Sequence, residues 1–150
     1  MKIRITSDLH TDINKTIEFG FVKHINDCDL TLIAGDIAGG YKQEELFLDN
    51  LVKQGLEKPV ICVGGNHLGY NNEQGTKEYQ LRQLIDKFNE TPSNIHYLEN
   101  QCWHLSDDYV VYGGTMYTDF GLYNDKPRKY YGEVAEQWMN DFRYVETYNP

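Results

Sequence analysis

The stretch that decides the fold is LTLIAGD, residues 30–36, which is followed by VICVGGNH, residues 60–67. Each begins with a short apolar run, as is typical of a strand buried on both faces of a parallel sheet. Each run then reaches glycine and a polar side chain able to bind a metal, namely Asp36 in the first stretch and Asn66 and His67 in the second. The N-terminal stretch KIRITSDLH, residues 2–10, alternates polar and apolar residues and has no glycine, but it also ends in metal-capable side chains, Asp8 and His10.

Helical patterns separate these three strands. Residues 43–56 and 76–89 repeat apolar side chains at helical spacing, and a further helix is expected over residues 14–26. Strands that alternate with helices pair in parallel through right-handed crossovers. The sequence therefore predicts an α/β fold with a parallel or mixed sheet and flanking helices, in one domain that covers residues 1–150.

The pattern changes after Pro92 to a period of about two residues. Three runs, residues 95–98, 102–105 and 109–117, predict a small β-meander, and Asp107-Asp108 makes a plausible turn between the last two. A final helix is expected over residues 132–144.

The polar residues at the three strand ends support a metal site more strongly together than each does alone. In open α/β sheets, ligands bind outside the carboxyl ends of the strands. Asp8, Asp36 and Asn66 lie roughly 30 residues apart, which is one βαβ unit. One edge of the sheet would then gather oxygen and imidazole donors without a thiolate, a set that suits Mn²⁺, Fe or Zn²⁺.

Each motif also has a purely structural explanation. Asp8 could cap a helix beside a surface His10, Gly35-Asp36 could form an ordinary strand-to-helix turn, and Gly65-Asn66 could form a conformational turn. These alternatives stay open for each motif alone. The recurrence of metal-capable residues at three successive strand ends favours the metal site.

With these motifs in place, the chain resembles the calcineurin-like metallophosphoesterase family. The residues that carry the resemblance are 7–10, 35–36 and 64–67, in the family's order and spacing, together with 114–120 and 139–142. The resemblance implies two divalent metal ions, Mn, Fe or Zn, and a metal-bridging hydroxide as nucleophile. It implies that Asp8 and His10 hold the first ion, Asp36 bridges both, Asn66 holds the second, and His67 acts as general acid.

The chain departs from the family's pattern in its second half. The family adds three histidines there, one after a further strand and two in a Gly-His-x-His turn, whereas only His96 and His104 follow His67 here. Leu68 also stands where many relatives have an acidic residue. We therefore expect a truncated domain, the first half of a ββ-sandwich, that alone binds one metal ion weakly.

Two functions follow as expectations. The first is metal-dependent hydrolysis of a phosphomonoester or phosphodiester, impaired in this short chain. The second is an inactive or split fragment that serves as a binding or assembly module, through self-association or with a complementing chain. An uncovered apolar face of a half-finished sandwich would support the second function.

The composition of the chain favours some classes of substrate and one cellular compartment. A net charge of −9 makes long nucleic acid and anionic membranes unlikely partners and leaves a phosphoester small molecule or a nucleotide. Tyr70, Tyr117 and Tyr123 could stack on a base or simply pack. The three widely spaced cysteines read as reduced, buried thiols, which predicts a cytoplasmic protein. The sequence shows no signal peptide and no stretch of transmembrane length.

Overall fold

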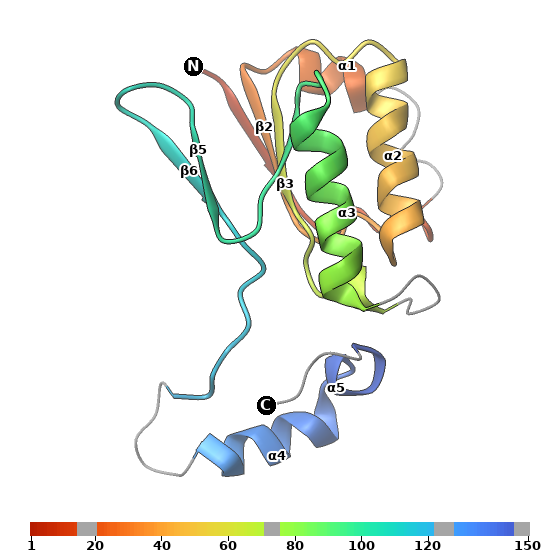
Figure 1. The fold of residues 1–150 in the computed structure, drawn as a ribbon, viewed down its shortest axis with the longest axis vertical. Coiled ribbons are helices and arrows are strands. Elements are labelled where there is room, and N and C mark those ends of the chain that lie inside the picture. The colour runs from red at the N-terminus through yellow and green to blue at the C-terminus, as the bar shows by residue number, and fades with distance from the viewer. Residues whose placement is uncertain (15–20, 71–75, 122–127, 146–150) are drawn as a thin grey trace.

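The computed structural model describes residues 1–14, 21–70, 76–121 and 128–145. Its centre is a four-stranded sheet in which every strand runs parallel to its neighbours, in the order β1-β2-β3-β4 (Figure 1). The four strands are β1 (Ile3–Thr6), β2 (Leu30–Ala34), β3 (Val60–Val63) and β4 (Ile95–Tyr97). The predicted α/β class with flanking helices is confirmed.

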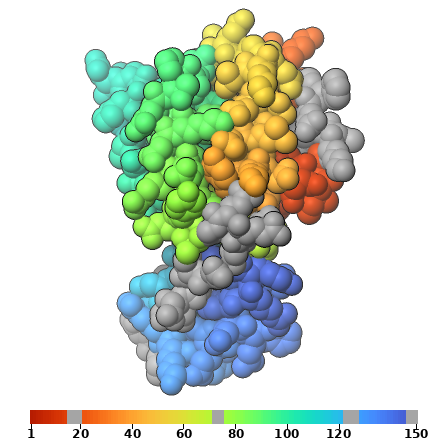
Figure 2. Space-filling model, turned by 45° about the vertical axis from the view of Figure 1, so that its right-hand side comes forward, coloured from red at the N-terminus to blue at the C-terminus, as the bar shows by residue number. Residues whose placement is uncertain are grey.

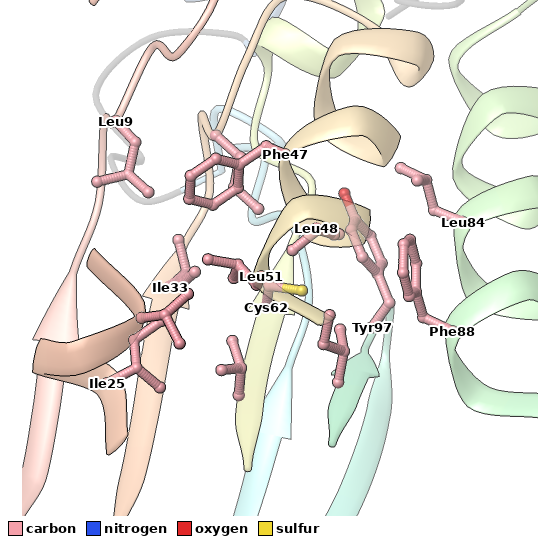
Figure 3. Packing of buried hydrophobic residues seen from close by; sticks show 14 of the residues in the cluster. Leu9, Ile25, Ile33, Phe47, Leu48, Leu51, Cys62, Leu84, Phe88 and Tyr97 are labelled. Carbon is pink, nitrogen blue, oxygen red and sulfur yellow. The ribbon is translucent and has the colours of Figure 1, made fainter. Parts of the chain in front are cut away.

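Three helices connect these strands and cover one face of the sheet. They are α1 (Phe21–Asn26), α2 (Tyr41–Lys53) and α3 (Lys77–Glu90). Figure 3 shows Leu48 and Leu51 of α2 near Cys62 of β3, and Phe88 of α3 near Tyr97 of β4, in one buried cluster. Burying these apolar side chains supplies the main stabilisation of the helix–sheet layer. Residues 15–20 of the predicted first helix lie outside the described residues.

The opposite face of the sheet is only partly covered. A two-stranded antiparallel hairpin, β5 (Gln101–His104) and β6 (Val110–Gly113), packs there through Trp103 and Val111. The cover does not reach β1, whose Ile5 remains 72% exposed on this face.

The prediction of a three-stranded β-meander is wrong in one respect. Residues 95–97 do not pair with residues 101–104 but join the main sheet, with Ile95 beside Val60 and Tyr97 beside Cys62. The physical reason is that α3 forms a crossover, which returns the chain parallel to β3. Only the last two runs form an antiparallel pair.

The C-terminal part of the described chain is helical. The helix expected over residues 132–144 is two helices, α4 (Arg128–Trp138) and α5 (Asp141–Tyr144). Figure 2 shows these residues, in blue, as a lobe below α2 and α3. In the part of the chain that the structure describes, no helix has the length and apolar character needed to span a membrane.

The cysteines follow the expectation in two cases of three. Cys28 and Cys62 are buried as free thiols, whereas Cys102, on the hairpin, is exposed. The buried pair behaves as small core residues. The prediction for Cys102 rested on the general burial of free cysteines, and it is wrong because the sequence does not show which face of the hairpin meets the sheet.

Candidate metal centre

The three loops that follow β1, β2 and β3 continue the pairing of the sheet beyond the strands. The backbone N–H of Asp8 donates to the carbonyl of Gly35 at 3.2 Å, and that of Asp36 donates to the carbonyl of Gly64 at 3.3 Å. The N–H of His10 donates to the carbonyl of Asp36 at 3.1 Å. The loops are thereby held side by side at one edge of the sheet, as the sequence predicted.

Two glycines permit this close approach. A Cβ atom on Gly35 would lie 2.9 Å from the Cα of Gly65, and a Cβ atom on Gly65 would collide with the carboxylate and the backbone nitrogen of Asp36. Both glycines also have positive φ angles, 88° and 71°. Glycine is required at these positions because any larger residue would push the Asp36 loop away.

His10, Asp36 and His67 form the core of the site. One ligand atom from each of these half-buried residues lies within 4.8 Å of the other two. The imidazole rings of His10 and His67 are 4.5 Å apart between centroids, and the backbone N–H of His67 donates to the Asp36 carboxylate at 3.0 Å. Within the described residues this is the one group of at least three His, Cys, Asp or Glu donors at such spacing.

Asp8 lies beside this group and not within it. Its carboxylate is 3.9 Å from the Nε2 atom of His10, accepts a hydrogen bond from the Ser7 hydroxyl, and is 66% exposed. A small rotation of this exposed side chain would bring an oxygen toward an ion held by His10. The predicted pairing of Asp8 with His10 thus stays a prediction with a compatible geometry.

Asn66 is held by two residues to which the sequence reasoning gave no part in the metal site. Its side-chain nitrogen donates to the Asp141 carboxylate at 2.7 Å and to the Tyr70 hydroxyl at 3.2 Å. Tyr70 donates in turn to Asp141 at 2.5 Å, and its ring stacks on His67 at 4.2 Å. Burial, followed by this hydrogen bond to Asp141, raises the pKa of Tyr70 to about 12. The only sequence signal for Asp141 was the resemblance of residues 139–142 to a family motif.

A cavity of about 500 Å³ opens next to these residues. Asp36, Asn66 and Asp141 line it together with apolar side chains that include Met116 and Phe142. A cavity that joins a few convergent polar groups to an apolar wall is typical of a small-molecule site.

A buried cation lies in the same region as these carboxylates. The Lys77 ammonium donates to the Tyr117 hydroxyl at 2.6 Å and lies 4.4 Å from the centre of the Tyr117 ring. Burial lowers the pKa of Lys77 to about 8, although nearby carboxylates, Glu99 first and then Asp141, oppose that shift. Burial likewise raises the pKa of Tyr117.

The donor set fits a divalent cation. The Nδ1 atom of His10 is buried and has no hydrogen-bond partner among the described residues. Such an atom costs free energy unless something satisfies it. Imidazole nitrogens with a carboxylate are common ligands of Mn²⁺, Fe and Zn²⁺.

Comparison with known proteins agrees with this geometry. No curated protein sequence matches the chain significantly. A solved structure, the phosphopantetheinyl hydrolase PptH from Mycobacterium tuberculosis, superposes with a TM-score of 0.65 and 17% sequence identity. The match covers 99% of this chain and 57% of that one, so the chain spans little more than half the length of its structural neighbour. The family model of the calcineurin-like phosphoesterases matches residues 1–150, and the chain therefore belongs to that family.

Proposed function

We propose that this chain takes part in metal-dependent hydrolysis of a phosphomonoester or a phosphodiester. The observation that carries the proposal is the meeting of His10, Asp36 and His67 at the carboxyl ends of three parallel strands, with ligand atoms within 4.8 Å of one another. Membership of the calcineurin-like phosphoesterase family supports the same chemistry.

The residues would divide the work as follows. Asp8 and His10 would hold one ion, Asp36 would bridge two, and Asn66 would contribute its amide oxygen to the second. Divalent ions at such a site polarise phosphoryl oxygens and lower the pKa of water. One Asp36 oxygen already accepts the N–H of His67, which fixes the carboxylate and leaves its other oxygen for an ion.

His67 would act as the proton donor to the leaving oxygen. Its ring stacks on Tyr70 at 4.2 Å and meets His10 edge to face at 4.5 Å between centroids, and these two contacts restrain the ring. Leu68, which stands in place of an acidic neighbour, is fully buried in the core and supplies no charge to His67. The proton donor would therefore rely on the backbone and on stacking for its orientation.

The cavity beside Asp36 and Asn66 would receive the organic part of the substrate. Its wall combines Met116, Tyr117 and Phe142, which suits an apolar or aromatic group attached to the phosphate. A phosphoester small molecule or a nucleotide remains the proposed substrate class. A substrate panel should include a phosphopantetheine ester, because the structural neighbour is a phosphopantetheinyl hydrolase.

The proposal is tested by titrating Mn²⁺ into the protein by calorimetry and by measuring turnover of an aryl phosphomonoester and an aryl phosphodiester. We expect weak binding with slow turnover, and we expect His10→Ala and Asp36→Ala each to weaken Mn²⁺ binding by about tenfold or more. His104→Ala is the matched control, since His104 is exposed on the hairpin. Wild-type protein that binds no Mn²⁺ would contradict the proposal, as would binding that survives Asp36→Ala.

One observation favours the competing function of an inactive binding or assembly module. Ile3 and Ile5 expose apolar side chains, by 42% and 72%, on the face of the sheet that the hairpin leaves uncovered. Sedimentation of the purified chain separates the two functions. A metal-free, inactive oligomer would favour the module, and activity that appears only on mixing with a second chain would favour a split enzyme.

A further inference from the structure

The side chain of Asp141 is buried at the start of α5 and joins two residues of the metal centre. Asp141 is 8% exposed, and one of its carboxylate oxygens accepts hydrogen bonds from the Asn66 amide at 2.7 Å and from the Tyr70 hydroxyl at 2.5 Å. A carboxylate taken out of water needs such donors. These contacts connect residues 75 and 71 positions away in the sequence, so they depend on the tertiary fold.

The chemistry of a carboxylate decides which way the Asn66 amide faces. An ionised carboxylate only accepts hydrogen bonds, so the atom of Asn66 that meets Asp141 must be the amide nitrogen. The Tyr70 hydroxyl is 3.2 Å from the same nitrogen and 2.5 Å from the same Asp141 oxygen, so both acceptors lie on one side of the amide nitrogen. Because these two contacts fix the position of the amide nitrogen, the amide oxygen faces away from Asp141, toward the side from which a cation would bind.

We propose that Asp141 is a positioning residue that fixes the Asn66 side chain so that its oxygen can bind a metal ion, with Tyr70 as its helper. The inference rests on the proposed function, because it assumes that Asn66 is a metal ligand. Asp141, Asn66 and Asp36 line the same cavity, so the oriented amide and the carboxylate proposed to bridge the ions border one space. Hydrogen bonds to a metal ligand from outside the coordination sphere commonly strengthen binding by 10- to 100-fold.

Tyr70 gives this arrangement a second point of contact. Its hydroxyl contacts both Asn66 and Asp141, while its ring stacks on His67 at 4.2 Å and contacts Tyr144 of α5 at 5.4 Å. The same side chain therefore restrains a proposed ligand and the proposed proton donor. Removing only its hydroxyl, by Tyr70→Phe, separates the first task from the second.

The test is a calorimetric titration of Mn²⁺ into the full chain and its variants. Asp141→Ala should weaken Mn²⁺ binding by about tenfold. Asp141→Asn should stay within about threefold of wild type, because its amide oxygen can still accept both hydrogen bonds. In an Asn66→Ala background, Asp141→Ala should cause no further loss, since the residue that it orients is gone. Asn140→Ala, an exposed neighbour, is the control and should bind as wild type does.

Each other outcome has a separate meaning. Wild-type protein that binds no Mn²⁺ would refute the proposed function itself. Unchanged binding in Asp141→Ala, or a loss that persists in the Asn66→Ala background, would overturn the inference alone. An equal loss in Asp141→Asn would overturn it in favour of a direct carboxylate ligand.

A melting curve of each metal-free variant guards against misfolding. If Asp141→Ala does not fold, Tyr70→Phe decides the matter, because it keeps the ring and removes one of the two anchors of the amide. We expect Tyr70→Phe to bind Mn²⁺ about two- to fivefold more weakly at an unchanged metal-free melting temperature. Wild-type affinity in Tyr70→Phe would then overturn the inference.

Discussion

Three residues in the loops around the candidate metal centre adopt a backbone conformation that non-glycine residues rarely adopt. Asp8, His10 and Asp36 have φ angles of 53°, 43° and 53°. The left-handed region costs roughly 1–2 kcal/mol for a residue with a Cβ atom. Aspartate and histidine tolerate this region better than most residues, and such strain tends to occur at functional sites. The hydrogen bonds between the three loops hold the residues in place.

The close contact between Gly65 and Asp36 leads to a prediction. Gly65→Ala should reduce the free energy of unfolding by about 3 kcal/mol or more and abolish Mn²⁺ binding, because the new Cβ atom would collide with the Asp36 carboxylate and backbone. Chemical denaturation and calorimetry would measure the two effects.

Gly55→Ala is the matched control for this variant. Gly55 also has a positive φ angle, 85°, but a Cβ atom there would meet nothing within 4 Å. It should cost only about 1 kcal/mol and leave Mn²⁺ binding unchanged. Equal losses in the two variants would show that backbone strain, and not the contact with Asp36, explains the Gly65 effect.

The sequence singled out three residues that meet at the edge of the sheet, but not the residues that hold Asn66 there. His10, Asp36 and His67 were found because each follows an apolar strand at a spacing of one βαβ unit. Asp141 could not be found in this way, because its contact with Asn66 depends on how a helix 75 residues later returns to the sheet. The spacing of motifs along the sequence indicates how neighbouring strands and helices connect, but not which distant helix packs against the end of the sheet.

At the scale of elements, a buried polar contact fixes β4 to α2. The Tyr97 hydroxyl donates to the Glu44 carboxyl at 2.7 Å, and both side chains are fully buried. Burial raises the pKa of Glu44 well above its usual value. The other Glu44 oxygen has no hydrogen-bond partner among the described residues, so the tyrosine is its main support.

Tyr97→Phe should therefore destabilise the protein by about 1–3 kcal/mol, since it leaves a buried carboxyl without its side-chain donor. Urea denaturation measures the change. Tyr109→Phe serves as the control, because Tyr109 is 59% exposed, and it should change stability by less than about 0.5 kcal/mol. A neutral Tyr97→Phe would mean that Glu44 finds another donor.

The element predictions succeeded where the periodicity was strong. The helices over residues 41–53 and 77–90 and the first three strands lie within a few residues of the expected bounds. The strand at residues 95–97 was recognised, but its partner was not, because alternation along one strand does not identify its neighbour. The break between α4 and α5 at residues 139–140 was not predicted, because these residues include no proline or glycine to indicate the end of a helix.

For the whole molecule, pH should act on stability through Lys77. Burial lowers its pKa from 10.5 to about 8 in the folded chain. Between these two values the unfolded chain holds a proton that the folded chain has released, so the Lys77 contribution to the free energy of unfolding increases as pH rises through this window.

Comparison of wild type with Lys77→Met isolates this contribution. The wild-type free energy of unfolding, relative to that of Lys77→Met, should rise by about 1–2 kcal/mol between about pH 7.5 and pH 9.5. Lys129→Met, at a side chain that is 86% exposed, should show no such rise relative to wild type. A flat difference for Lys77→Met would show that the ammonium stays protonated throughout this range.

The left-handed conformations of Asp8 and His10 carry a consequence for protein engineering. Glycine adopts these angles without strain, so Asp8→Gly or His10→Gly would lower the free-energy cost of the backbone while it deletes a proposed metal ligand. A screen that selects for heat resistance alone would accumulate such changes, and the selected variants would lose the ability to bind a metal ion. Directed evolution of this chain therefore has to measure binding of the proposed metal ion alongside survival at high temperature.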